Sequence, residues 1–213
     1  MERVSTIPGN LPIIIAAPHG FDDTNTDVLA EYMAGFLDCF VVINRGWIKS
    51  TTVDWRKNQA NCNNVVHCHE DVVQDEFLDP LMRYVVQILR KNSHAHLFVI
   101  HGVGSHMRSF INDLDVIVGA GRGTQFSSSS CVEGRKDAVV GSMIAAGLGV
   151  YEGVDNKYAG RGKNNLNQLY RRWYPDDRVQ SMQLEIIYDL RKTKTISQAT
   201  ANIIATCIRR SFR

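Results

Sequence analysis

Short hydrophobic runs in this chain alternate with stretches in which apolar residues recur every three or four positions. The run Leu11–Ala17 is continuous and contains three isoleucines, which is typical of a strand buried on both faces. Helical spacing follows from Val28 to Leu37 and returns from Phe77 to Leu89. Similar short runs predict further strands at Phe40–Ile43, Leu97–Ile100, Val116–Val118 and Val179–Ile187.

This order of elements predicts an α/β fold with a mostly parallel sheet and helices on both faces. Two later helices are expected, at Ala138–Leu148 and after a capping box formed by Thr195 and Gln198. The long polar stretch Gly46–Glu76 and the patch Ser127–Ser130 predict loops, and long loops in compact domains are often functional. We interpret residues 1–213 as a single domain.

Composition narrows the function classes. The 213 residues are 44% hydrophobic and 22% charged, which suits one globular domain, and the net charge of +2 gives no electrostatic case for nucleic acid or membrane partners. Five cysteines without a CxxC motif favour a reducing compartment. No run approaches the ~18 apolar residues of a membrane span, and the polar start lacks a signal peptide's apolar core. We expect a cytoplasmic protein with a small-molecule substrate; the sequence does not indicate an oligomeric state.

Two predicted strands end in a histidine followed by a glycine. His19 follows the first strand, His101 follows a later one, and Asp22 lies three residues after His19. The carboxyl ends of parallel strands share one edge of a sheet, where ligands bind. Two imidazoles and a carboxylate are the donors of a catalytic zinc site, so we expect His19, Asp22 and His101 to bind a metal. Zinc is the default, and Mn, Fe or Ni also suit this set. The alternative is that Asp22 or Asp23 caps the next helix.

Glu185 is the candidate general base. It stands among apolar residues of the last predicted strand, and a buried carboxylate needs a partner or a chemical role. Beside a bound metal it could accept a proton from water. The alternative is a structural ion pair with an arginine such as Arg191.

Other candidates remain open. His67 and His69 form a His-x-His pair that could bind metal, His106 could line a pocket, and His94 and His96 are interpreted as surface residues. The glycine-rich segment 119–123 lacks the spacing of a nucleotide-binding loop. Its Arg122 could instead bind a substrate carboxylate, as could Arg161, which has Tyr158 nearby.

The order of these motifs resembles the N-formylglutamate amidohydrolase family, which is related to the zinc carboxypeptidases and the aspartoacylase-type deacylases. The resemblance covers most of the chain, through the segments Pro18-His19-Gly20, Asp23–Thr26, Val42–Arg45, Ala60–Asn64, Ile100–Gly102, Asp115–Gly119, Tyr158–Gly162 and Val179–Glu185. It implies a three-layer, mixed but mostly parallel sheet of the phosphorylase/hydrolase-like type, as in the zinc carboxypeptidases.

The resemblance also implies roles for particular residues. His19, Asp22 and His101 would hold zinc, and Glu185 would be the general base. Asn63 occupies the first position of an Asn-Arg pair that grips the substrate, but the second position here is Asn64. An asparagine does not reproduce the bidentate contact of an arginine with a carboxylate, so that contact is missing here or comes from elsewhere. The replacement candidates are Arg122, Arg161 and Arg56.

Three functional hypotheses follow. The first is a metal-dependent hydrolase that cleaves the amide bond of a small N-acylated amino acid resembling N-formylglutamate. The second is a carboxypeptidase or amidase acting on peptides or cell-wall fragments. The expected loops at Gly46–Glu76 and Ser127–Ser130 would leave room for such a longer substrate. The third is a non-catalytic relative that binds a metal or a small molecule. This hypothesis stays open because Asn64 stands where the family pattern has an arginine.

Overall fold

A mixed sheet forms the centre of the computed structural model, which describes residues 2–123 and 129–212. In this described part the sheet has seven strands in the order β1-β3-β2-β4-β7-β5-β6. Strands β3, β2, β4 and β7 run parallel to one another, whereas β1 and β5 are antiparallel to β3 and β7. The strand bounds are β1 Val4–Ile7, β2 Leu11–Ala17, β3 Cys39–Asn44, β4 Ala95–Val103, β5 Val116–Gly119, β6 Val150–Glu152 and β7 Val179–Ile187.

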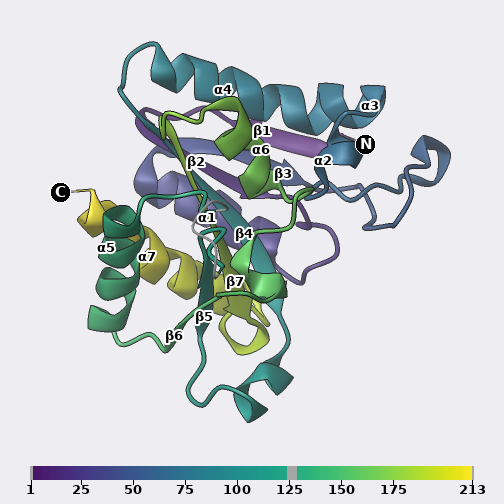
Figure 1. Cartoon of the computed structure of the whole chain (residues 1–213). Helices are drawn as coiled ribbons and strands as arrows, with labels where there is room; N and C mark the ends of the chain where they lie inside the picture. Colours follow the sequence, from purple (N-terminus) through teal and green to yellow (C-terminus); the bar gives the residue numbers. More distant parts are fainter. Residues whose placement is uncertain (1, 124–128, 213) are drawn as a thin grey trace.

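Helices cover both faces of the sheet (Figure 1). Helices α1 (Thr26–Leu37), α5 (Glu133–Ala145) and α7 (Lys194–Ser211) pack into one hydrophobic core with the sheet. Helices α4 (Asp79–Leu89) and α6 (Leu166–Trp173) pack into a second core on the opposite face. The short segments are η1 Trp55–Lys57, α2 Val65–Cys68, α3 Asp71–Val73, the π-helical η2 Gln74–Leu78, η3 Ser105–Ser109, η5 Lys157–Ala159 and η6 Tyr188–Leu190. No described helix combines the length and apolar character needed to span a membrane.

The alternation of side chains along each strand separates the two cores. In β4, Phe98 and Ile100 belong to the core under α1 and α7, whereas Leu97 and Val99 belong to the core under α4 and α6. Because successive side chains point to opposite faces, His101 continues the series of Leu97 and Val99. The same period of two assigns Glu185 of β7 to that face. The strand pattern therefore places both polar side chains on one side of the sheet.

The predicted α/β fold with a mostly parallel mixed sheet is confirmed. The sequence analysis missed β1, β6 and α6, and it placed the last cap wrongly. The side chain of Thr193, not Thr195, accepts the cap hydrogen bond from the amide of Ile196, and the helix begins at Lys194. Residues 127 and 128 of the expected serine loop lie outside the described residues.

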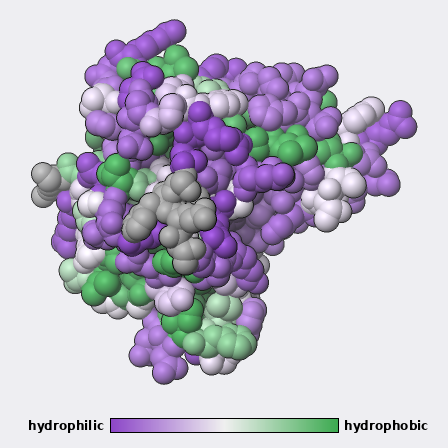
Figure 2. Space-filling view, viewed as in Figure 1, coloured by the Kyte–Doolittle hydropathy of each residue, from purple (hydrophilic) through white to green (hydrophobic). Residues whose placement is uncertain are grey.

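One face of the molecule is largely polar (Figure 2), and the cysteines lie in the interior. The face shown in Figure 2 is predominantly hydrophilic, with hydrophobic residues in separate small groups. The cysteines Cys39, Cys62, Cys68, Cys131 and Cys207 are all free and buried. Burial raises the pKa of the Cys68 thiol to about 12, so it remains protonated at neutral pH.

Asn44 fixes the turn that leaves β2. This asparagine is buried at the end of β3, and its side-chain Nδ2 donates to the carbonyls of Pro18 (2.8 Å) and Trp47 (2.7 Å). Its Oδ1 accepts from the backbone amides of Gly46 and Trp47. A Cβ at Gly20 would lie 2.4 Å from the Asn44 carbonyl oxygen, so only glycine allows the turn to pass so close. The end of β3 thus holds the segment that contains His19.

Replacing Asn44 by alanine is expected to lower the free energy of unfolding by about 2–4 kcal/mol, because buried backbone groups lose their partners. Chemical denaturation with urea measures the change. Asn202→Ala, on the exposed side of α7, is the matched control and should leave stability within about 0.5 kcal/mol. Equal stability of the two variants would contradict this role for Asn44.

Candidate active site

A single turn after β2 brings His19 and Asp23 together. The carbonyl oxygen of His19 accepts from the amides of both Asp22 (3.0 Å) and Asp23 (2.8 Å), so the chain winds like one turn of helix. In such a turn the residue four positions later returns over the first. His19 is buried, and the Asp23 carboxylate also accepts from the amide of Gly102 (3.0 Å) at the end of β4. The turn and β4 thereby share one carboxylate.

His19, Asp23 and His101 form a group that could hold a metal ion. Their potential ligand atoms all lie within 4.8 Å of one another. The Oδ2 atom of Asp23 is 3.7 Å from the His19 Nδ1 and 3.9 Å from the His101 Nδ1. These separations are too long for hydrogen bonds. They are close to the roughly 3.4 Å expected between two ligands that share a tetrahedral zinc ion. Donor types and spacing therefore fit a divalent metal.

The sequence analysis chose Asp22 for this group, and the structure puts Asp23 there instead. The Asp22 side chain is exposed, and its Oδ2 accepts from the amide of Lys49 at 2.7 Å. Asp23 does not cap helix α1; the cap position is Asn25, without a side-chain cap bond. Because i+3 and i+4 both lie near residue i in a helical turn, spacing alone did not distinguish the two carboxylates.

Hydrogen bonds hold the His19 ring in one orientation. The Asn61 Oδ1 lies 2.8 Å from the His19 Nε2 and also accepts from the amide of Asn63. An asparagine Oδ1 can only accept, so the His19 Nε2 donates to it and the Nδ1 faces Asp23. The amide of Asn61 in turn donates to the Nδ1 of buried His67. This chain of contacts fixes the tautomer and orientation of the first imidazole.

His101 is held differently. It is buried, and its ring makes no hydrogen bond with any described residue, which leaves its Nε2 orphaned. Desolvation, followed by repulsion from His19, lowers the pKa of His101 to about 3. The ring is therefore neutral at physiological pH and has a lone pair to offer a metal.

Glu185 lies beside this group on the neighbouring strand. The parallel register pairs Glu185 of β7 with His101 of β4. Burial, and then the nearby charge of Asp23, raises the pKa of Glu185 to about 8. One carboxylate oxygen accepts from the Gln183 Nε2 at 3.2 Å. Its expected alternative partner, Arg191, makes no hydrogen bond or ion pair with it and binds backbone carbonyls instead.

Arg191 ties the three segments of the site together. Its guanidinium is 4% exposed and donates to the carbonyls of Thr24 (2.7 Å), Val103 (3.2 Å) and Ile186 (3.0 Å). These carbonyls follow Asp23, His101 and Glu185 by one or two residues. A Cβ at Gly102 would lie 2.3 Å from the Arg191 Cζ, so glycine is needed there for the arginine to fit. The guanidinium thus fixes the relative positions of the candidate ligands and base.

A cavity of about 420 Å³ opens over the group. Besides His19, Asp23, His101 and Glu185, its walls include the polar residues Lys49, Asn61, Asn63, His106, Lys157, Tyr158, Asn165 and Gln183. Two of these were expected to contact substrate. Among the described residues, the buried Oδ1 of Asn63 has no hydrogen-bond partner, and the Tyr158 hydroxyl lies 3.4 Å from the sulfur of Met107. His106 lines the cavity as expected.

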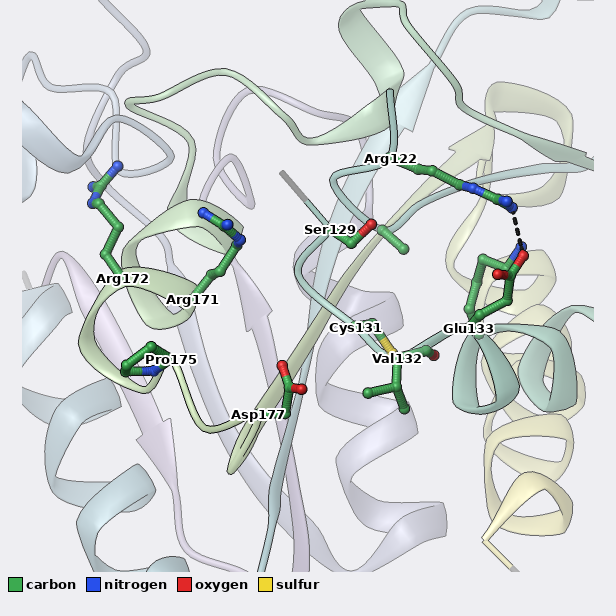
Figure 3. Close-up of a pocket in the computed structure, with 11 residues that line it drawn as sticks. Arg122, Ser129, Cys131, Val132, Glu133, Arg171, Arg172, Pro175 and Asp177 are labelled. Atoms are coloured by element: carbon green, nitrogen blue, oxygen red, sulfur yellow. Dashed lines mark hydrogen bonds and ion pairs between the residues drawn. The ribbon is translucent and has the colours of Figure 1, made fainter. Parts of the chain in front are cut away.

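The other expected substrate-binding residues lie elsewhere. Asn64 caps α2, with its side chain accepting from the amide of Val66. Arg122 lines a separate cavity of about 580 Å³ and pairs with Glu133, as the dashed line in Figure 3 shows. Arg161 is bound to Asp155 at 2.6 Å. Arg56 lies over the exposed ring of Trp55. None of these four lines the 420 Å³ cavity.

The remaining histidines do not form a rival site. His67 is buried and accepts from the amide of Asn61. His69 is exposed, and its ring lies near that of Trp173. One side chain therefore faces the interior and the other faces solvent. His96 is not a surface residue. It is buried with its ring 4.4 Å from that of Phe212, and burial lowers its pKa to about 3. Among described residues, the metal-type group is confined to His19, Asp23 and His101.

The sequence analysis did not identify Asn61, Lys49, Lys157, Asn165 or Gln183. Asn61 and Asn165 could have been proposed from the sequence, because each lies in a polar, asparagine-rich segment that precedes a helix. Gln183 could have been found from its spacing, since it lies two residues before Glu185 and so on the same face of β7. The lysines had no signal, because isolated lysines in polar loops usually face solvent.

Comparison with solved structures supports the fold. An N-formylglutamate amidohydrolase from Ralstonia eutropha JMP134 matches with a TM-score of 0.61 at 14% identity, covering 99% of each chain. A bacteriophage poly-gamma-glutamate hydrolase matches with a TM-score of 0.58 at 14% identity, covering 98% of this chain and 86% of the other. A metallo-carboxypeptidase from Burkholderia cenocepacia matches with a TM-score of 0.53 at 13% identity, covering 99% and 65%. The resemblance noted in the sequence is therefore confirmed at the level of the fold.

Sequence comparisons add nothing to this. No protein-family model matches the chain, and no curated protein matches it. At such low identities the neighbours establish a shared α/β fold and nothing more, and the chemistry depends on this chain's own residues.

Arg191→Met is expected to lower the free energy of unfolding by about 2–4 kcal/mol, because three buried carbonyls lose their charged donor. Gly102→Ala should have a similar effect, through the clash of its Cβ with the guanidinium. Urea denaturation measures both. The control is Arg90→Met at the exposed end of α4. If Arg191→Met were as stable as Arg90→Met, the three-carbonyl contact would not be needed by the fold.

Proposed function

We propose that the protein is a metal-dependent hydrolase that cleaves the amide bond of a small N-acylated amino acid. One observation carries the proposal. His19, Asp23, His101 and Glu185 meet in one cavity at the carboxyl ends of three parallel strands, where open α/β sheets bind ligands. Two imidazole nitrogens, one carboxylate and a separate glutamate are the parts that metal-assisted hydrolysis requires.

The residues divide the chemistry between them. His19, Asp23 and His101 would hold the metal, with zinc favoured by the donor set and Mn, Fe or Ni also suited. A bound divalent cation supplies Lewis acidity, which lowers the pKa of water and polarises a carbonyl. Glu185, beside His101, would act in its ionised form: it would accept the proton of the attacking water and then donate it to the leaving nitrogen. The Asn63 side chain and the Tyr158 hydroxyl, both on the cavity wall, contact the reacting amide.

A longer substrate is the second candidate. The fold is shared with a poly-gamma-glutamate hydrolase and a metallo-carboxypeptidase, so peptide-like chains belong in the assay. The cavity of about 420 Å³ lies at the lower end of the usual range for small-ligand pockets, and this favours the smaller substrate. Profiling hydrolysis of formyl-, acetyl- and peptidyl-glutamate discriminates between the two. A non-catalytic relative would hydrolyse none of them.

Asp23→Ala and His19→Ala are expected to lose the bound metal, because each removes one of three protein ligands. Asp22→Ala is the matched control: it removes a neighbouring carboxylate that binds the Lys49 amide, and it should retain about one metal per chain. Metal analysis after dialysis against a weak chelator gives the stoichiometry. Metal retained by Asp23→Ala but lost by Asp22→Ala would assign the ligand role to Asp22.

Glu185→Gln is expected to keep the metal and lose at least about a hundredfold in kcat, because the amide cannot accept the proton of water. The variant has nearly the same shape, so its thermal stability should match the wild type or exceed it once the buried carboxylate is gone. Metal content and turnover of N-formylglutamate are measured on the same samples. Unchanged turnover would remove Glu185 from the mechanism.

A further inference from the structure

A second cavity lies outside the candidate active site. Its volume of about 580 Å³ exceeds that of the 420 Å³ cavity over His101 and falls within the usual range for small-ligand pockets. The two cavities share no lining residue. Asp177, just before the first residue of β7, lines the second cavity, whereas Glu185, near the end of β7, lines the first. The nine residues of this strand span about 30 Å, so the two cavities open near different ends of it.

Two neighbouring arginines form one side of the second cavity. Arg171 and Arg172 belong to the last turn of α6, and Figure 3 shows both side chains on the same side of the cavity. Arg172 donates to the backbone carbonyl of Lys163, which brings an exposed lysine next to the pair. Within the described part of the chain, neither guanidinium is joined to a carboxylate. This side of the cavity therefore has two positive charges that no neighbouring side chain balances.

The cations on the opposite side are already paired. Arg122 lies 2.8 Å from a carboxylate oxygen of Glu133, as Figure 3 shows. Lys136 is buried and lies 2.5 Å from Glu152 and 2.9 Å from Asp137. These ion pairs leave little positive charge for a ligand on that side. The charge that the cavity offers to an anion is therefore concentrated at α6.

The rest of the lining supplies an apolar surface and one carboxylate. Ala120, Cys131, Val132 and Pro175 are the apolar residues, and Figure 3 shows Asp177 between Pro175 and Val132. Among the described residues, the Asp177 carboxylate has no hydrogen-bond or ion-pair partner. Such a carboxylate accepts hydrogen bonds from hydroxyl groups, as the acidic residue of dinucleotide-binding folds does with a ribose. The cavity thus combines a cationic side, an apolar surface and a hydrogen-bond acceptor.

We propose that this cavity is a second ligand site, which binds a small organic phosphate that carries hydroxyl groups, such as a nucleoside monophosphate. The fork of donors on a guanidinium matches the oxygens of a phosphate, and two adjacent guanidiniums match the nearly double charge of a phosphate monoester. Asp177 binds hydroxyl groups of the ligand, and the apolar residues contact its uncharged body. The site does not depend on the proposed hydrolysis, because it shares no residue with the metal-type group.

Calorimetric titration with adenosine monophosphate (AMP) tests the proposal. The wild type should bind AMP at a single site, and adenosine, which lacks the phosphate, should bind at least about tenfold more weakly. Arg171→Met and Arg172→Met should each weaken AMP binding by about tenfold. Arg90→Met removes an exposed arginine outside the cavity and is the matched control, with unchanged affinity.

Two results of this titration would overturn the proposal. The first is equal AMP affinity in the wild type and in the double variant Arg171→Met/Arg172→Met, in which case the arginines serve only to stabilise the end of α6. The second is absence of binding for both AMP and ribose 5-phosphate, a smaller member of the same ligand class that is titrated in parallel.

Amide chemical shifts locate the bound nucleotide. Addition of AMP to isotope-labelled protein should move the resonances of Cys131, Val132 and Asp177 and leave those of Asn61 and Gly102 in place, because only the first three belong to the second cavity. The opposite pattern would place AMP at the metal-type group. That result would overturn the second site and leave the proposed hydrolase function untouched.

Discussion

The candidate site depends on one buried guanidinium. Arg191 donates to carbonyls that follow the residues of interest on three separate segments: Thr24 after Asp23, Val103 after His101, and Ile186 after Glu185. Strand pairing fixes β4 against β7, but the turn after β2 lies beyond the last residue of its strand and needs another anchor. A planar guanidinium carries five donors in a fixed geometry, so it can reach three acceptors on separate segments at once. The missing side chain of Gly102 provides the space for it.

Burial gives the site its electrostatic character. Desolvation lowers the pKa of His101 and raises that of Glu185, so each group is pushed toward its uncharged form. The Asp23 carboxylate has a lowered pKa, because His19, His101 and the Gly102 amide outweigh its own burial. The site thus combines a neutral imidazole at His101, one retained negative charge at Asp23 and a protonatable glutamate. This is a set of groups whose charges a divalent cation would balance.

Much of the fold could be predicted because the sheet has a strong hydrophobic period. Strand β7 was predicted with its observed bounds, since Val179–Ile187 is buried on both faces. Helix α6 was missed although Leu166, Leu169 and Tyr170 have helical spacing, because arginines and amides surround them. The edge strands β1 and β6 are too short for a pattern to be distinctive. His96 could not be placed, since its cover, Phe212, comes from the far end of the chain.

The location of the site could be predicted from the sequence, but not which of two adjacent aspartates lies in it or which arginines are held in ion pairs. The strand-end rule brought His19 and His101 to one edge, and Glu185 was found separately, as a carboxylate among the apolar residues of the last strand. The rule could not distinguish Asp23 from Asp22, because the two residues are adjacent and only the conformation of the turn decides which carboxylate faces the histidines. The arginines failed as candidates because their carboxylate partners are adjacent in space: Asp155 neutralises Arg161, and Glu133 pairs with Arg122. An ion pair between loops leaves no periodic signal in a sequence.

The location of the metal is the central claim. The most direct measurement is an anomalous difference map, recorded at the zinc absorption edge, from crystals of the protein loaded with one equivalent of zinc. One strong peak is expected within about 2.0–2.2 Å of a nitrogen of His19, a nitrogen of His101 and an oxygen of Asp23. A peak at His67 or His69, or one bound by Asp22 in place of Asp23, would contradict it.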